Sequence, residues 1–265
     1  MKEEVMAAHG KCATLERFVG KLKVGEPISH GGLRVFPLRG GAPPGPDYIL
    51  SEDALSEESL LITGVDESGS VPELLTTSTA KVMILLIEGE ELIGAKQNRI
   101  LNTSILLPPQ TRTRIPVSCV EEGRWRYVSN AFGVGAHAPA SVRAAKSMDV
   151  GRNLRRYGRP DSDQNAVWEK VAQSMKGLGV RSATMAMHDA VQQREDVLYE
   201  YIEALPYPTG ARGMIAAVEG RFAAMDLFDK PETLELVWVR LLTGLVLEVL
   251  VRGGRSSKRF GLRQA

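Results

Sequence analysis

The chain has 265 residues, of which 43% are hydrophobic and 25% charged, a composition typical of a globular protein with one large core or two modest ones. Its formal net charge of +1 excludes a strong global field that would draw it to nucleic acid or to an anionic membrane. The two cysteines, Cys12 and Cys119, form no C-x-x-C pair, which argues against a disulfide framework and a thiolate zinc site.

No segment has the pattern of a secretory signal or a membrane span. The N-terminus carries early acids and no long apolar stretch. The longest apolar run, Leu241–Val251, is interrupted by Thr243, Gly244 and Glu248. We therefore expect a cytoplasmic protein without a membrane partner.

The first half of the chain has the pattern of a β structure. Up to about residue 130, short apolar or alternating runs are separated by Gly, Pro and Asp clusters, which predicts a twisted antiparallel sandwich or a partial barrel. A short helix is expected at Ser51–Ser56, and Glu88, Glu90 and Glu91 are interpreted as an acidic cluster at a turn. The expected strands are Leu33–Leu38, Leu60–Val65, Val82–Glu88, Ile100–Leu107, Ile115–Val120 and Trp125–Val128.

Helical periodicity dominates from Pro139 onward. Helices are expected at Ser141–Tyr157, Asp161–Gly177 and Thr184–Leu205, and a last one begins at Pro231, a favourable first helical residue, and stops at Gly253-Gly254.

The segment between the last two helices consists of two short apolar runs, 213–218 and 221–227, joined by Glu219-Gly220. A two-residue connector ending in Gly favours a β-hairpin. The alternative is one continuous helix, which intrinsic propensity favours. We prefer the hairpin, so the fold class is α+β: a β-sandwich or partial barrel, followed by helices plus a β-hairpin.

This pattern divides the chain into three parts. Residues 1–135 form a β-rich part with a polar motif, and residues 136–252 form a helical part packed on it as one unit. Residues 253–265 form a basic tail, which is interpreted as a solvated end rather than a phosphate-binding arm.

The polar motif begins at Gly94. Lys96 and Arg99 are candidate phosphate or carboxylate ligands, and Gln97, Asn98 and Asn102 are candidates for hydrogen bonds to hydroxyls or to the edge of a base. Gln97, Arg99 and Asn102 occupy positions where a buried strand normally carries Val or Ile. The alternative is a polar turn that leads into a strand.

A second polar group begins at Cys119, which is a candidate nucleophile if a cation stabilises its thiolate and otherwise a small buried hydrophobe. Glu121 is a candidate general base or ribose ligand, Arg124 a phosphate ligand, and Trp125 a stacking face. The alternative is a Glu–Arg ion pair beside a core Trp. The four histidines are scattered, so no metal site is predicted, and the cofactor, if any, is unknown.

The segments GAKQNRILN, IPVSCVEEGRW and GMIAAVEGRFAAMDLFDKPETLELVW resemble a family of prokaryotic proteins. It is the ARG-and-rhodanese-phosphatase-superfamily-associated protein domain family, where ARG means ADP-ribosylglycohydrolase. The matching positions are Gly94, Lys96, Gln97 and Arg99, and then Cys119, Glu121, Gly123, Arg124 and Trp125. The resemblance implies work near NAD-derived or ADP-ribose-type nucleotides and assigns no catalytic residue.

Two functional hypotheses follow. In the first, the chain binds or processes a phosphorylated, nucleotide-like small molecule related to ADP-ribose or NAD; if it is an enzyme, the reaction is hydrolysis or transfer. In the second, it is a non-catalytic structural or protein-interaction module whose polar residues form a buried network. Nucleic acid is not an expected partner, and the sequence does not fix the oligomeric state.

Overall fold

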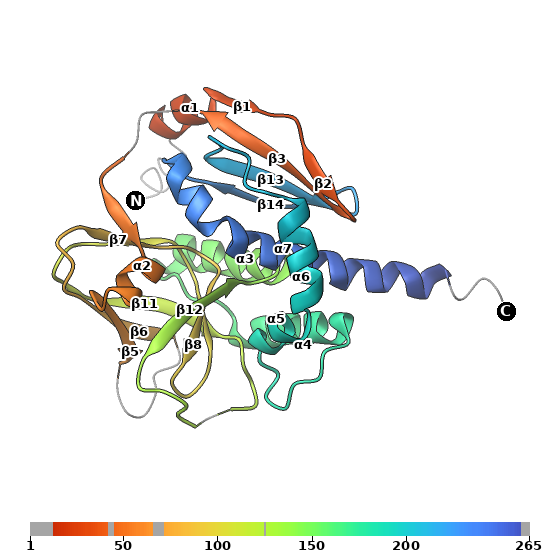
Figure 1. The fold of residues 1–265 in the computed structure, drawn as a ribbon. Helices are drawn as coiled ribbons and strands as arrows, with labels where there is room; N and C mark the ends of the chain where they lie inside the picture. Colours follow the sequence, from red (N-terminus) through yellow and green to blue (C-terminus); the bar gives the residue numbers. More distant parts are fainter. Residues whose placement is uncertain (1–12, 42–44, 66–71, 125, 261–265) are drawn as a thin grey trace, which may run out of the picture.

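The computed structural model describes residues 13–41, 45–65, 72–124 and 126–260, and it confirms the α+β class (Figure 1). The N-terminal half contains sheets that form a partial barrel and are antiparallel except for the parallel pair of β4 and β7, and the C-terminal half contains helices and a hairpin. Among the described residues, no helix combines the length and the apolar character needed to cross a membrane.

The first sheet joins the two ends of the fold. Its order is β1-β3-β13-β14, with β2 also paired to β3, and all its pairs are antiparallel. The predicted hairpin is confirmed: Glu219 and Gly220 have φ of 51° and 71°, and two positive φ angles are typical of a type I′ turn. The strands of this sheet are β1 (Leu22–Val24), β2 (Ile28–His30), β3 (Leu33–Gly40), β13 (Gly213–Val218) and β14 (Arg221–Leu227).

The partial barrel is built from a six-stranded sheet, β12-β8-β9-β11-β6-β5, and a three-stranded sheet, β10-β7-β4. Its interior is a cluster of fully buried aliphatic side chains that includes Leu92, Leu101 and Val117. The short helix α2 (Ser51–Ser56) has the predicted bounds. The strands are β4 (Tyr48–Leu50), β5 (Leu60–Gly64), β6 (Glu73–Ser78), β7 (Met83–Leu86), β8 (Glu90–Gly94), β9 (Arg99–Leu101), β10 (Ile105–Leu107), β11 (Arg112–Cys119) and β12 (Phe132–His137).

Helix α7 lies between the first sheet and the rest of the molecule (Figure 1). Residues 241–249 are all buried, as expected for a helix that is covered on every side. One side of α7 packs in the cluster with the first sheet and α6, and another side packs in the cluster with α4 and α5. The helices are α1 (Ala13–Val19), α3 (Ala140–Tyr157), α4 (Gln164–Leu178), α5 (His188–Gln193), α6 (Glu195–Ala204) and α7 (Pro231–Phe260).

Two strand predictions and one turn prediction need correction. Glu88 lies in a turn as predicted, but Glu90 and Glu91 belong to strand β8, which pairs with β12 and β9, and both side chains are buried. The predicted strand Ile100–Leu107 is two strands, β9 and β10, separated by a turn at Asn102–Ser104. Residues 126–128 are exposed and form no strand, and Trp125 lies outside the described residues.

Two helix predictions also need correction. The predicted helix Thr184–Leu205 is two helices, α5 and α6, because Arg194 between them leaves helical geometry with φ of −120°. Helix α7 does not stop at Gly253-Gly254 but continues to Phe260, so residues 253–260 belong to this helix. A glycine inside a helix costs only about 1 kcal/mol relative to Ala, too little to stop a helix that is anchored by buried turns.

Candidate functional site

Strand pairing brings the two predicted polar segments together. Strand β9 lies between β8 and β11, with Arg99 opposite both Leu92 and Cys119. Beyond the strands, the loops also touch: the Val120 N–H donates to the Asn98 carbonyl at 3.1 Å. Residues about twenty positions apart in sequence therefore form one cluster at the ends of β9 and β11.

Arg124 and Glu121 form a buried, two-pronged ion pair, with 8% and 4% of their side chains exposed. Arg124 Nε donates to Glu121 Oε1 at 2.8 Å, and Nη2 donates to Oε2 at 2.6 Å. Its other donors reach the carbonyls of Ala95 (2.7 Å) and Arg126 (3.1 Å) and Oδ1 of Asn98 (3.0 Å). All five N–H groups of this guanidinium thus have acceptors within the protein.

The same ion pair holds a strained loop. Ala95 has φ of 44°, a left-handed conformation that non-glycine residues seldom adopt, and its carbonyl accepts from both Arg124 and the Val128 N–H. Glu121 also accepts from the Asn98 N–H (3.0 Å) and the Thr184 hydroxyl (2.8 Å). Burial alone would raise the pKa of Glu121, but hydrogen bonds, first of all from Arg124, lower it below its ordinary value.

Glu91 lies next to this pair and is fully buried. Burial raises its pKa to about 8; the Asn98 side chain opposes this shift, and the Glu121 carboxylate adds to it. Its Oε2 has no hydrogen-bond partner in the part of the chain that the structure describes. Glu91 is therefore a protonated carboxylic acid at neutral pH, a state that the sequence did not reveal.

Arg99 differs from Arg124 because it lacks a carboxylate partner. It is only 3% exposed, and its Nη1 donates to Gln97 Oε1 at 3.1 Å and, weakly, to the Gln97 carbonyl at 3.5 Å. Its Nε has no acceptor, and no carboxylate oxygen of the described residues lies within 4.0 Å of it. Burial lowers the pKa of Arg99, as expected for a cation without a counter-ion.

The position of Arg99 is at one end of the barrel interior. Directly opposed residues of antiparallel strands point to the same face of a sheet, so Arg99 and Cys119 share the face of Leu92. Leu92 belongs to the barrel interior. Burial raises the pKa of the Cys119 thiol, although Arg99 lowers it, so the sulfur is a thiol at neutral pH rather than an activated thiolate.

The remaining predicted site residues are spread around this cluster. Lys96 is half-buried, with its ammonium 5.1 Å from the centre of the Tyr127 ring. The amide nitrogen of Gln97 reaches the Glu122 carbonyl at 3.5 Å. Asn102 makes structural contacts instead: its amide nitrogen donates to the Pro160 carbonyl (3.1 Å) and its amide oxygen accepts from the Ser118 hydroxyl (2.7 Å), which ties the α3–α4 connection to the sheet.

The sequence did not predict several buried or part-buried polar contacts. Gln164, at the start of α4, uses its amide to accept from the Cys119 N–H (2.7 Å) and to donate to the Cys119 carbonyl (2.9 Å). Lys146 is fully buried and pairs with Glu88 at 2.6 Å. Arg143, one helical turn away, bridges Glu88 and Asp226. The i, i+3 spacing of Arg143 and Lys146 in a basic helix was the available signal for this second cluster.

The described residues contain no group of three or more His, Cys, Asp or Glu side chains that could hold a metal ion. The arrangement of the site is instead one saturated ion pair, one neutral acid and one buried cation without a counter-ion. Chemically, the Arg99 guanidinium keeps an unused donor at Nε, whereas the Glu121 carboxylate binds groups of the protein's own loops.

The chain belongs to the ARG and Rhodanese-Phosphatase-superfamily-associated Protein domain family, whose model matches residues 21–263. The match covers both polar segments, the hairpin and all of α7, so it confirms the resemblance drawn from the three sequence segments. No curated protein and no solved structure matches the chain significantly.

Proposed function

We propose that this protein binds a phosphorylated, nucleotide-like small molecule at the end of the partial barrel, and that Arg99 contacts its anionic group. The observation that carries the proposal is the buried Arg99 guanidinium, which has an unpaired Nε and no carboxylate among the described residues. A buried cation without a counter-charge is costly, and a phosphate oxygen is a natural partner for the planar arginine fork.

The neighbouring residues have supporting roles in this proposal. Gln97 fixes the orientation of Arg99 through the 3.1 Å bond to Nη1. The Glu121–Arg124 pair holds the loop from Gly94 to Asn98, because Arg124 donates to both ends of that loop and to Glu121. No donor of Arg124 is left for a ligand. The association with ADP-ribosylglycohydrolases in the family name favours ADP-ribose and NAD-type nucleotides as the ligand class.

The saturated ion pair also favours a second candidate function, a non-catalytic module whose polar network fixes the sheet geometry. In that case Arg99 is part of the same structural network, and no nucleotide binds. The two functions predict opposite effects of removing the Arg99 charge, which makes them separable in one experiment.

The experiment compares wild type with Arg99→Met, which keeps the length and removes the charge. If Arg99 binds the anionic group of a ligand, its charge is uncompensated in the free protein. Arg99→Met then raises the melting temperature of the free protein, because it removes this buried charge. The same variant abolishes the rise in melting temperature that ADP-ribose, ADP or NAD gives the wild type. Pyrophosphate and adenosine, tested separately, show which part of the ligand Arg99 contacts.

The control is Arg114→Met, which removes an exposed cation (62% of its side chain accessible) paired with Glu73. It should change neither stability nor ligand response appreciably. The proposal is wrong if no nucleotide at millimolar concentration shifts the wild-type melting temperature, or if Arg99→Met binds as wild type does. A large loss of stability in Arg99→Met supports the structural module.

A further inference from the structure

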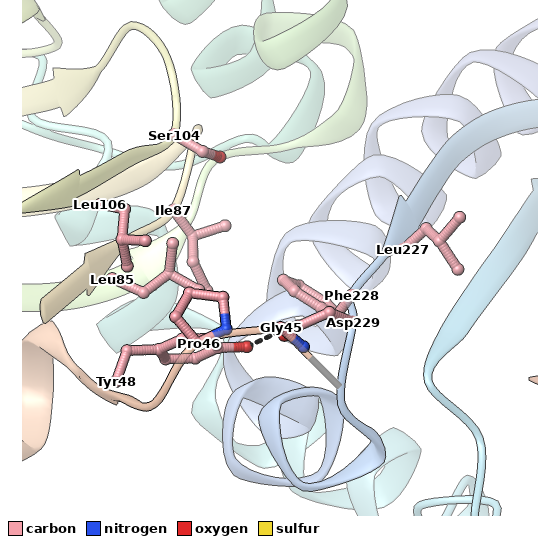
Figure 2. Close-up of a pocket in the computed structure, with 10 residues that line it drawn as sticks. All are labelled: Gly45, Pro46, Tyr48, Leu85, Ile87, Ser104, Leu106, Leu227, Phe228 and Asp229. Atoms are coloured by element: carbon pink, nitrogen blue, oxygen red, sulfur yellow. Dashed lines mark hydrogen bonds between the residues drawn. The ribbon is translucent and has the colours of Figure 1, made fainter. Parts of the chain in front are cut away.

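A cleft of about 370 Å³ lies on another side of the barrel, between strands β7 and β10 and the connection from β14 to α7. Figure 2 shows Leu85, Ile87 and Leu106 on one wall, with Phe228 and Asp229 opposite. Its size is at the lower end of the range for clefts that hold small organic ligands, and such clefts are mostly apolar. None of the residues around Arg99 lines it.

One wall of the cleft carries a carboxylate in a fixed orientation. Asp229 Oδ1 accepts from the Tyr48 hydroxyl, and Oδ2 accepts from the Gly45 N–H at 2.9 Å (Figure 2). An ionised carboxylate has about four acceptor sites, so two remain available. The carboxylate is therefore held rigidly without being saturated.

This carboxylate also lacks a cation. No Lys, Arg or His nitrogen lies within 4.0 Å of it among the residues that the structure describes. The adjacent Lys230 lines a neighbouring cavity instead, where its ammonium lies 4.5 Å from the centre of the Tyr48 ring and pairs with Asp47 at 3.3 Å. Arg212 binds the main-chain carbonyl of Asp229 and not its side chain (2.9 Å).

A hydroxyl near the opposite wall completes the polar features of the cleft. The Ser104 oxygen accepts from the Glu88 N–H at 2.9 Å, and its proton has no acceptor among the described residues. Ser104 can therefore donate one hydrogen bond into the cleft, whose remaining walls are mainly carbon.

We infer that this cleft binds a small apolar or aromatic molecule that carries a protonated amine, with the ammonium on Asp229 and the apolar body against Leu85, Leu106 and Phe228. Charge complementarity selects the amine, because a half-buried carboxylate without a cation gains most from a charged donor. The inference does not depend on the proposed nucleotide site at Arg99.

The probe for this site is tryptamine, with indole-3-acetate as an aromatic molecule of similar size and opposite charge. Calorimetric titration should show saturable binding of tryptamine. The affinity for indole-3-acetate should be lower by a factor of about ten or more. Asp229→Asn keeps the shape of the wall and should remove this preference. Leu106→Trp places an indole in the cleft and should abolish binding of tryptamine.

The matched control is Val82→Trp, since Val82 is 39% exposed, Leu106 is 38% exposed, and Val82 does not line the cleft. This variant should bind tryptamine as wild type does. Melting curves of each free variant establish that it is folded. The inference is overturned if tryptamine does not bind wild type at millimolar concentration, if indole-3-acetate binds equally well, or if Leu106→Trp leaves binding unchanged.

Discussion

At the scale of single residues, the two arginines of the polar cluster have different roles although the sequence presents them alike. Arg124 directs every donor to the protein, mainly to Glu121 and to the carbonyl of the strained Ala95. Arg99 has one side-chain partner, Gln97, and an unpaired Nε. Arg124 therefore stabilises the loop, and Arg99 is the residue that we propose contacts an anion.

We expect Arg124→Ala to destabilise the protein by about 3–5 kcal/mol, because it leaves the buried Glu121 carboxylate without its cation. Urea denaturation measures this loss as a lower free energy of unfolding. The matched control is Arg114→Ala, which breaks the exposed pair with Glu73 and should cost less than about 1 kcal/mol. Equal losses in the two variants would mean that the buried pair has no special structural role.

Glu91 gives the protein a distinctive pH dependence. Its pKa is about 8 in the folded protein and near the ordinary 4.5 in the unfolded chain, so the folded state holds the proton more tightly. Its contribution to stability is complete below pH 4.5, declines as the pH rises and is lost above pH 8. Between pH 4.5 and pH 8, the free energy of unfolding of wild type should fall by up to roughly 1.4 kcal/mol per pH unit relative to that of Glu91→Gln.

Comparing the two proteins isolates Glu91 from other titrating groups. His137 is buried and burial lowers its pKa, which favours the folded state as the pH rises and so opposes the effect of Glu91. His137 is present in both proteins, so the difference in free energy of unfolding between them, measured from pH 5 to 8, reports Glu91 alone. A difference that does not change with pH would show that Glu91 is ionised in the folded protein.

At the scale of elements, the sequence predicts those whose stabilising contacts are local. The hairpin β13–β14 is fixed by its Glu219-Gly220 turn, and α2 was predicted to the residue. Strand β8 was missed because its acids are buried in the folded protein, where Glu90 accepts from Arg240, 150 positions along the chain, and Glu91 accepts from Asn98 of the β8–β9 connection. The meeting of the two polar segments and the Glu121–Arg124 ion pair, which the sequence offered as an alternative, were predictable. The carbonyls of Ala95 and Arg126 that take the other Arg124 donors were not, since only the fold positions them.

Helix α4 is attached to strand β11 through Gln164, whose amide pairs with both backbone groups of Cys119. We expect Gln164→Ala to cost about 2–3 kcal/mol, because it leaves a part-buried N–H and carbonyl without partners. Hydrogen exchange at the Cys119 amide should accelerate in the variant. Urea denaturation provides the change in stability.

The chain contains its own control for this contact. Gln193 pairs in the same two-pronged way with the backbone of Arg181, but at an exposed position where water can replace the amide. Gln193→Ala should therefore cost less than about 1 kcal/mol. If Gln193→Ala costs as much as Gln164→Ala, burial is not what gives the α4–β11 attachment its strength.

At the scale of the whole molecule, α7 links regions that the sequence presents as separate halves. Arg240 of α7 donates to Glu90 of the barrel (3.0 Å), and Glu248 accepts from the Ser141 N–H at the start of α3 (3.0 Å). The same helix packs against β13 of the first sheet. The sequence could not predict this arrangement. Helix α7 packs on a sheet in which β13 pairs with β3, and these two strands are about 180 residues apart in the chain.

Helix α7 packs closely against the barrel at Gly244. A Cβ atom there would lie 2.6 Å from the Ala138 carbonyl oxygen and 2.7 Å from that of His137, both backbone atoms that cannot rotate away. Gly244→Ala should therefore destabilise the protein by about 1–3 kcal/mol, even though Ala is the better helix former by about 1 kcal/mol. Thermal denaturation measures the loss as a lower melting temperature.

Gly253→Ala is the control in the same helix, because nothing lies within 4 Å of the Cβ atom that it adds. It should leave stability unchanged or raise it by up to about 1 kcal/mol. Since α7 contacts the first sheet, the barrel and α4, both variants should unfold in a single transition that is the same by fluorescence and by circular dichroism. Two separate transitions, or a Gly244→Ala variant as stable as Gly253→Ala, would show that α7 does not join the molecule into one cooperative unit.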